Sequence, residues 1–102
     1  MTIGTGGKYR GVKAVSAGAA EQTLTVNSEW HQRIDGQGAI DVLLPAEAAG
    51  LSVFITNTAD GAEALTVKDD SDSNTIIVID QNESALLHCN GTTWEASGVT
   101  ES

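Results

Sequence analysis

Hydrophobic and polar residues alternate along most of this chain after residue 21, the pattern of a β-strand with one buried face. Strands of this kind are expected at residues 22–26, 30–34, 39–44, 51–55 and 64–68. Turns rich in Asn, Asp and Gly separate them, and Pro45 ends the third. Residues 46–50 have room for one helical turn at most. Short strands at this spacing predict an all-β fold, a small antiparallel β-sandwich or barrel-like module.

The same alternation assigns side chains to faces. Leu24 and Val26 share a face, as do Trp30, Gln32 and Ile34. The inward face of the third strand carries Ile40, Val42 and Leu44. In the fourth strand Phe54 points away from the side that carries Leu51, Val53 and Ile55.

Residues 74–94 are the segment around which the rest of the chain is expected to be arranged. They predict strands at 75–80 and 84–90, joined by a polar turn at 80–83, and a second turn at Asn90-Gly91 that leads back to Trp94. This is a β-meander. In the first strand Ile76, Ile77, Val78 and Ile79 are consecutive, so both faces need cover. We expect one face in the core and the other at an oligomer interface.

Charge divides the chain into two parts. Residues 1–20 are rich in Gly and Ala, contain no acidic residue and carry +3, whereas residues 21–102 hold two basic residues against all 14 acidic ones and carry −12. We expect an extended basic N-terminal arm at 1–20, with a short strand at 9–15, and a β-sandwich domain at 21–102. The arm is expected to bind a partner through Lys8, Tyr9, Arg10, Val12 and Lys13.

Composition excludes several classes of partner. A net charge of −9 repels phosphate backbones, so nucleic acid is not expected. No stretch approaches the ~18 apolar residues of a membrane span. One cysteine, Cys89, and an N-terminus without an apolar run predict folding in a reducing cytoplasm.

No metal, cofactor or catalytic site is expected. The loop at 69–74 is acidic, but the calcium-binding EF-hand pattern needs Gly and Glu where Thr75 and Gln81 stand. His88 and Cys89 are adjacent on a strand and point to opposite faces, so they cannot share one ion. Ser84, Asp80 and His88 lack an oxyanion-hole segment. Trp94 and Trp30 each have two interpretations, a core or interface residue and a sugar-stacking platform.

Five segments carry a family resemblance: LPAEAAGLSVFITNT, ALTV, IIVID, ESALLHC and NGTTW. Together, over about residues 39–97, they resemble a β module that recurs in tailed-phage virion proteins, both head decoration proteins and tail-fibre segments. The resemblance implies a virion structural part that is often a trimer.

The function expected from this resemblance is capsid decoration. The protein would be a cement protein, a homotrimer that binds the major capsid protein on the outer surface of a phage head and stabilises contacts between capsid subunits. It would be made in the host cytoplasm. The alternative is a tail-fibre or receptor-binding module that binds carbohydrate; an enzyme is not expected.

Overall fold

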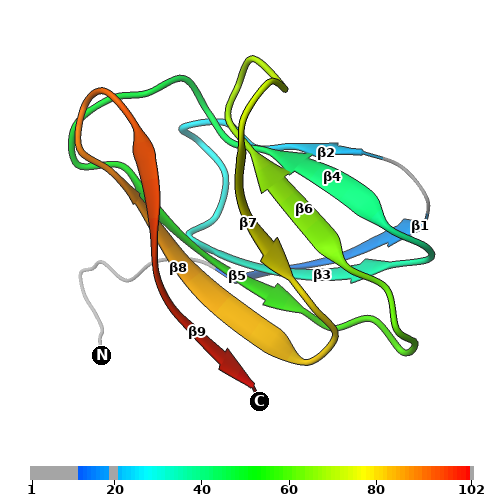
Figure 1. Cartoon of the computed structure of the whole chain (residues 1–102). Helices are drawn as coiled ribbons and strands as arrows, with labels where there is room; N and C mark the ends of the chain where they lie inside the picture. The colour runs from blue at the N-terminus through cyan, green and yellow to red at the C-terminus, as the bar shows by residue number, and fades with distance from the viewer. Residues whose placement is uncertain (1–11, 19–20, 102) are drawn as a thin grey trace.

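The computed structural model describes the backbone of residues 12–18 and 21–101 and the side chains of residues 21–97 (Figure 1). This part of the chain forms nine strands and no helix: β1 (Val12–Gly18), β2 (Gln22–Thr23), β3 (His31–Gly36), β4 (Ile40–Leu43), β5 (Ser52–Asn57), β6 (Leu65–Lys68), β7 (Thr75–Ile79), β8 (Glu83–Cys89) and β9 (Trp94–Glu101). They build a five-stranded sheet in the order β1-β3-β5-β8-β9 and a four-stranded sheet in the order β2-β4-β6-β7. The expected all-β class is confirmed.

The expectation of purely antiparallel pairing was wrong. The first six strands alternate between the two sheets, and each of the first four pairs in parallel with the strand two positions later along the chain. Antiparallel pairing involves only β7, β8 and β9, which pair with β6, β5 and β8 respectively. Both sheets are therefore mixed. Alternation of apolar residues shows which side chains are buried, but it does not show which strand lies beside which.

The expected meander is correct in its second half only. β8 and β9 form a hairpin whose turn is closed by Asn90, because its Oδ1 accepts the N–H groups of Thr92 at 2.9 Å and Thr93 at 3.0 Å. β7 and β8, in contrast, belong to different sheets. The turn between them crosses from one sheet to the other, and the N–H of Asn82 donates to the carbonyl of Asn57 at 3.1 Å.

The core lies between the two sheets. Its buried side chains come from both inner faces and are mostly aliphatic: Leu24, Ile34, Ile40, Val42, Leu44, Val53, Ile55, Leu65, Val67, Ile79, Ala85, Leu87, Cys89 and Trp94. The predicted inward face of residues 39–44 is confirmed, as is the burial of Val53 and Ile55. Trp94 is 5% exposed and therefore a core residue, and its indole N–H donates to the carbonyl of Pro45 at 3.0 Å.

Two large residues of the alternating pattern lie outside this core. β2 ends after two residues, and a turn then leaves Val26 65% exposed. Trp30 precedes β3, and its ring stacks on Phe54, the outward residue of β5, at 5.6 Å between centroids. The expected helical turn at 46–50 is also missing. Gly50, with a φ of 88°, makes a simple turn there.

Asn57 joins the two sheets at the end of β5. It is 1% exposed, and its Nδ2 donates to the carbonyls of Glu63 at 2.8 Å and of Ile79 at 2.9 Å. Its Oδ1 accepts the N–H of Ala59 at 3.0 Å. Ile79 belongs to β7, in the other sheet, so one amide fixes the separation of the two sheets and the shape of the intervening loop. Asn57 was not singled out by the sequence pattern.

Candidate functional site

β7 is the predicted oligomer strand, and it lies at the edge of the four-stranded sheet (Figure 1). Ile79 is fully buried and Val78 is 46% exposed, whereas Ile76 and Ile77 are half-buried and pack on the rim of the core. A β-bulge between Val67 and Lys68 of β6 interrupts the pairing beside Ile76, which explains why consecutive isoleucines both reach the core. The need for apolar cover on both faces is met in large part within the chain, and the oligomer interface stays a prediction.

The outer edge of β7 has no strand partner among the described residues. An edge strand presents N–H and C=O groups that can pair with another chain, and proteins usually protect such edges with charged residues or proline. β7 contains neither; its sequence is TIIVI. On this side β7 contacts β9 of the other sheet, and the two strands belong to separate hydrogen-bonded ladders.

Acidic residues lie on both sides of this strand. The loop before β7 contains Asp69, Asp70 and Asp72, and the turn after it contains Asp80 and Glu83. Lys68, at the end of β6, is positively charged and pairs with Thr75, the first residue of β7. Its ammonium group lies 3.2 Å from a carboxylate oxygen of Asp41 and 3.1 Å from one of Asp72. The carboxylate of Asp72 therefore lies toward β6 and β4, on the paired side of β7.

The predicted arm is described in part. Lys8, Tyr9 and Arg10 lie outside the described residues. Val12 and Lys13 lie in β1, which pairs in parallel with β3 at the edge of the five-stranded sheet. Residues 12–18 are therefore paired with the sheet of the main domain, and β1 starts at Val12 beside His31.

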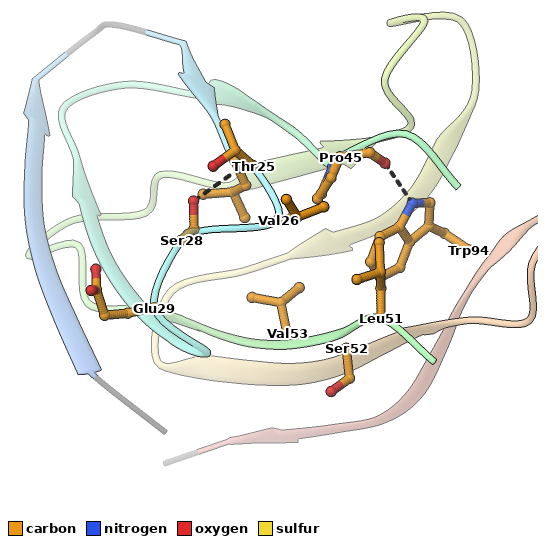
Figure 2. Close-up of a pocket in the computed structure, with 10 residues that line it drawn as sticks. Thr25, Val26, Ser28, Glu29, Pro45, Leu51, Ser52, Val53 and Trp94 are labelled. Carbon is orange, nitrogen blue, oxygen red and sulfur yellow. Dashed lines mark hydrogen bonds between the residues drawn. The ribbon is translucent and has the colours of Figure 1, made fainter. Parts of the chain in front are cut away.

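An apolar groove that the sequence pattern did not indicate lies at one end of the sandwich (Figure 2). Val26 stands at the tip of the loop between β2 and β3, with a depression on each side of it. The smaller one, of about 40 Å³, is bounded by Leu51 and Trp94, and the larger one, of about 330 Å³, by Leu43 and Ala46. The turn below Val26 is held by hydrogen bonds between Thr25 and Ser28. Asn27 and Ser28, two residue types that favour turns, follow Val26 and could have indicated this turn from the sequence.

Aromatic rings gather on the outer face of the five-stranded sheet. Trp30 stacks on Phe54, and His31 lies 4.8 Å from Phe54 between ring centroids. The indole N–H of Trp30 donates to the hydroxyl of Ser52 at 3.1 Å. Partial burial, and then the nearby charge of Arg33, lower the pKa of His31 below its ordinary value of 6.5. A neutral imidazole suits the 2.9 Å hydrogen bond between its Nε2 and the hydroxyl of Thr56.

The residues weighed for catalysis have separate partners. Ser84 hydrogen-bonds to the hydroxyl of Thr56 at 2.9 Å, whereas Nε2 of His88 bonds to the hydroxyl of Ser97 at 3.1 Å. Cys89 is buried in the core on the opposite face of β8 from His88, as adjacent strand positions require. The absence of catalysis stays a prediction.

Three carboxylates come close together beside the four-stranded sheet. Oxygens of Glu21, Asp41 and Asp72 lie within 4.8 Å of one another. The ammonium group of Lys68 already bonds to Asp41 and Asp72 and so supplies positive charge to this cluster. The bonds to these two carboxylates raise the pKa of Lys68. This arrangement is a surface ion-pair network. Of its three carboxylates, only Asp72 belongs to the acidic loop at 69–74 that the sequence analysis considered.

The loop at 69–74 folds around the carboxylate of Asp69. This group accepts hydrogen bonds from the hydroxyl of Ser71 and the Nδ2 of Asn74, both at 2.7 Å, and from the N–H groups of Ser73 and Asn74 at 3.3 and 3.4 Å. These bonds, with the Asn74 side chain as the largest cause, lower the pKa of Asp69 from 3.8 to about 2. The acidic loop is thus organised internally.

The lowered pKa of Asp69 predicts a specific loss of stability in acid. A carboxyl group with a lowered pKa stabilises the folded state above its ordinary pKa, and this contribution is lost as pH falls from about 4 to about 2. Thermal unfolding followed by circular dichroism across this interval should show a steeper fall of the midpoint in the wild type than in Asp69→Asn, which does not titrate. Equal slopes in the two proteins would contradict this role for Asp69.

The part of the chain that the structure describes has no helix long and apolar enough to cross a membrane. Comparisons of the chain with protein-family models, with curated proteins and with solved structures found no match.

Proposed function

We propose that this protein is a structural protein of a tailed-phage virion that works by assembly: a decoration protein bound to the outside of the head. In this role it contacts the major capsid protein, stabilises contacts between capsid subunits and acts as a homotrimer. The observation that carries the proposal is the edge of β7. It combines an edge position in the sheet that the described residues form, an exposed Val78 and a strand sequence without a charged residue or proline.

Two further features support a role in assembly. Half-buried Trp30 and His31 lie side by side on the outer face of the five-stranded sheet, and a hydrogen-bonded turn presents exposed Val26 beside an apolar groove. Exposed apolar groups of this kind are typical of protein interfaces. The resemblance of residues 39–97 to virion β modules then gives the class of assembly.

A tail-fibre or receptor-binding module is the second candidate. The stacked pair of Trp30 and Phe54 favours it, because half-buried aromatic rings bordered by hydroxyl groups can bind sugars. Ser52 and Thr56 supply such hydroxyls on the same sheet face. This candidate shares the virion location with the first and differs from it in copy number.

Copy number per virion tests both candidates. Virions whose genome encodes this chain would be purified, and the protein quantified by mass spectrometry against labelled standard peptides, with the major capsid protein as internal reference. Hundreds of copies per particle are expected for a decoration protein. A few to tens of copies would replace that function with the tail-fibre role, and absence from purified virions would reject both.

A further inference from the structure

The larger depression beside Val26 has walls that backbone hydrogen bonds hold in place. It has a volume of about 330 Å³ and lies between residues 23–26, at the end of β2 and beyond it, and residues 43–46, at the end of β4 and beyond it. The N–H of Leu24 donates to the carbonyl of Leu43 at 2.8 Å, and the N–H of Leu44 donates to the carbonyl of Lys68 at 2.9 Å. Ligand sites usually measure roughly 300 to 1,000 Å³, so this one suits a single bulky side chain.

Val26 is held outward at the rim of this depression. The N–H of Thr25 donates to the hydroxyl of Ser28 at 2.9 Å, a bond drawn in Figure 2, and the N–H of Ser28 donates to the carbonyl of Thr25 at 3.0 Å. These bonds fix the turn and leave Val26 65% exposed. A single exposed valine is ordinary, but this one borders an apolar depression on each side. A group that covers Val26 therefore removes a continuous apolar surface from water.

The charges around both depressions are negative. Asp70 lines the larger depression and Glu29 the smaller one, and among the described residues neither depression is lined by a lysine, an arginine or a histidine. The side chain of Asp70 is exposed and makes no hydrogen bond or ion pair within the described part of the chain. Lys68 is close by, because it pairs with Leu43, but its ammonium group is bonded to two other carboxylates. The charge of Asp70 is therefore available to a ligand.

The loop at 69–74 determines which of its acidic groups faces the depression. Asp69 points into the loop, where its carboxylate accepts hydrogen bonds from Ser71 and Asn74 at 2.7 Å. Asp72 points to the ammonium group of Lys68 at 3.1 Å. Both side chains have partners within the chain, and Asp70 is the member of the loop that lines the depression. An anion thus stands at a defined position beside an apolar site.

We propose that the larger depression binds a cationic apolar segment of a partner protein. A bulky aliphatic or aromatic side chain of that segment enters beside Val26, and a neighbouring lysine or arginine meets Asp70. This occupant deepens the proposed function and rests on it for the identity of the partner, which in that role is the major capsid protein.

Charge selects this class of occupant over others. The carboxylates beside the depressions repel phosphates and acidic peptides. The body of a second copy is disfavoured in the same way, because residues 21–102 hold 14 acidic residues and two basic ones. An exposed ion pair contributes little affinity, so covering of the apolar surface supplies most of the binding and the cation supplies the selectivity.

The first test uses two small probes that differ in charge. Phenethylammonium and hydrocinnamate carry the same phenyl ring on a two-carbon chain, the first with an ammonium group and the second with a carboxylate. Each is titrated into the full chain with labelled methyl groups, and the methyl resonances of Val26 and Val78 are followed by NMR. Phenethylammonium should shift Val26 with a saturable curve in the millimolar range, and hydrocinnamate should bind at least about threefold more weakly.

Val78 is the control within the same spectra, because it is the other large exposed apolar residue and lies on β7. Shifts at Val78 as large as those at Val26 would show general adhesion of the phenyl ring. That outcome, equal binding of the two probes, or no saturable shift at Val26 would overturn the proposal. Resonances of Val26 that shift with protein concentration alone would assign the depression to a second copy and would also overturn it.

The second test separates the charge from the apolar contact. Asp70→Asn should weaken phenethylammonium by about two- to fivefold and leave hydrocinnamate unchanged or slightly tighter. Asp60→Asn is the matched control: Asp60 is exposed, lies in the loop before β6 and lines neither depression, and its substitution changes the net charge equally. Val26→Ser should weaken both probes by a similar factor. An effect of Asp60→Asn as large as that of Asp70→Asn would overturn the role of Asp70.

A third test identifies the partner. Val26→Cys, labelled with a thiol-reactive photo-crosslinker, is bound to phage heads that lack the protein; Cys89 is buried. Illumination should join it to a peptide of the major capsid protein in which lysine or arginine lies beside a bulky apolar residue. A cross-link to another copy of this chain, or to a peptide without a basic residue, would overturn the proposal.

These outcomes are distinct from those of the copy-number measurement. Charge-selective binding at Val26 in a protein that is absent from virions would keep the site and reject decoration. Hundreds of copies per head, with Val26→Asp bound to heads as tightly as the wild type, would keep decoration and reject the depression as the contact.

Discussion

Replacing Asn57 with aspartate is expected to lower the free energy of unfolding by about 3 to 5 kcal/mol, a large part of the stability of a small domain. The amide nitrogen donates to the carbonyl oxygens of Glu63 and Ile79, and the side chain is 1% exposed. A carboxylate presents oxygens to both carbonyls, so two hydrogen bonds become repulsive contacts and a charge is buried without a partner. Urea denaturation at neutral pH measures the loss.

Asn90→Asp is the matched control for this substitution. Asn90 is exposed, and its side-chain oxygen accepts the N–H groups of Thr92 and Thr93, which a carboxylate does equally well. A change within about 0.5 kcal/mol is expected there. Burial raises the pKa of the carboxyl introduced at position 57, so its destabilisation should shrink as pH is lowered and the group is protonated. Similar losses in the two variants would show that Asn57 does not hold the sheets together.

The sequence pattern identified the strands well because burial and periodicity are local properties. Ile40, Val42 and Leu44 alternate with polar residues and are all buried. Leu24 and Val26 show where the pattern is insufficient. They alternate in the same way, yet β2 ends before both of them and only Leu24 is buried, since hydrogen bonds of Thr25 and Ser28 favour a turn.

Pairing of the strands was not predictable from the same information. A short polar turn can close a hairpin or carry the chain across the roughly 10 Å between packed sheets. The turn before β8 crosses, whereas the turn after it closes a hairpin, and both are rich in Asn and acidic or small residues. The contact that distinguishes them is the hydrogen bond from Asn82 to the carbonyl of Asn57, 25 positions earlier. Sequence periodicity contains no information on such distant contacts.

The candidate site, like the fold, could be predicted from the sequence only in its local features. The apolar run at 76–79 indicated a strand of unusual exposure, and the structure adds that it is an edge strand with Val78 outward. The bulge beside Ile76 depends on tertiary pairing with β6, so no local pattern indicates it. The groove at Val26 likewise arises from two loops that meet only in the folded chain.

Truncation of Trp94 to alanine is expected to lower the free energy of unfolding by about 3 to 5 kcal/mol, because a buried ring is replaced by a cavity. Trp94 is 5% exposed and begins β9, and its indole N–H donates to the carbonyl of Pro45, 49 positions earlier. Trp94→Phe keeps most of the packing but leaves that carbonyl without this donor, so a loss of about 1 to 3 kcal/mol is expected. Trp30→Ala should cost clearly less than Trp94→Ala, since Trp30 is half-buried on an outer sheet face.

Fluorescence distinguishes the two tryptophans independently of stability. Trp30→Phe leaves Trp94 as the single tryptophan, and a ring that is 5% exposed should emit at shorter wavelength and resist quenching by iodide. Trp94→Phe leaves Trp30, whose emission should be red-shifted and more readily quenched. If Trp94 were the quenched residue, and if Trp94→Ala left the denaturation midpoint unchanged, the ring would be a surface platform available to a sugar, and the core between the two sheets would close without it.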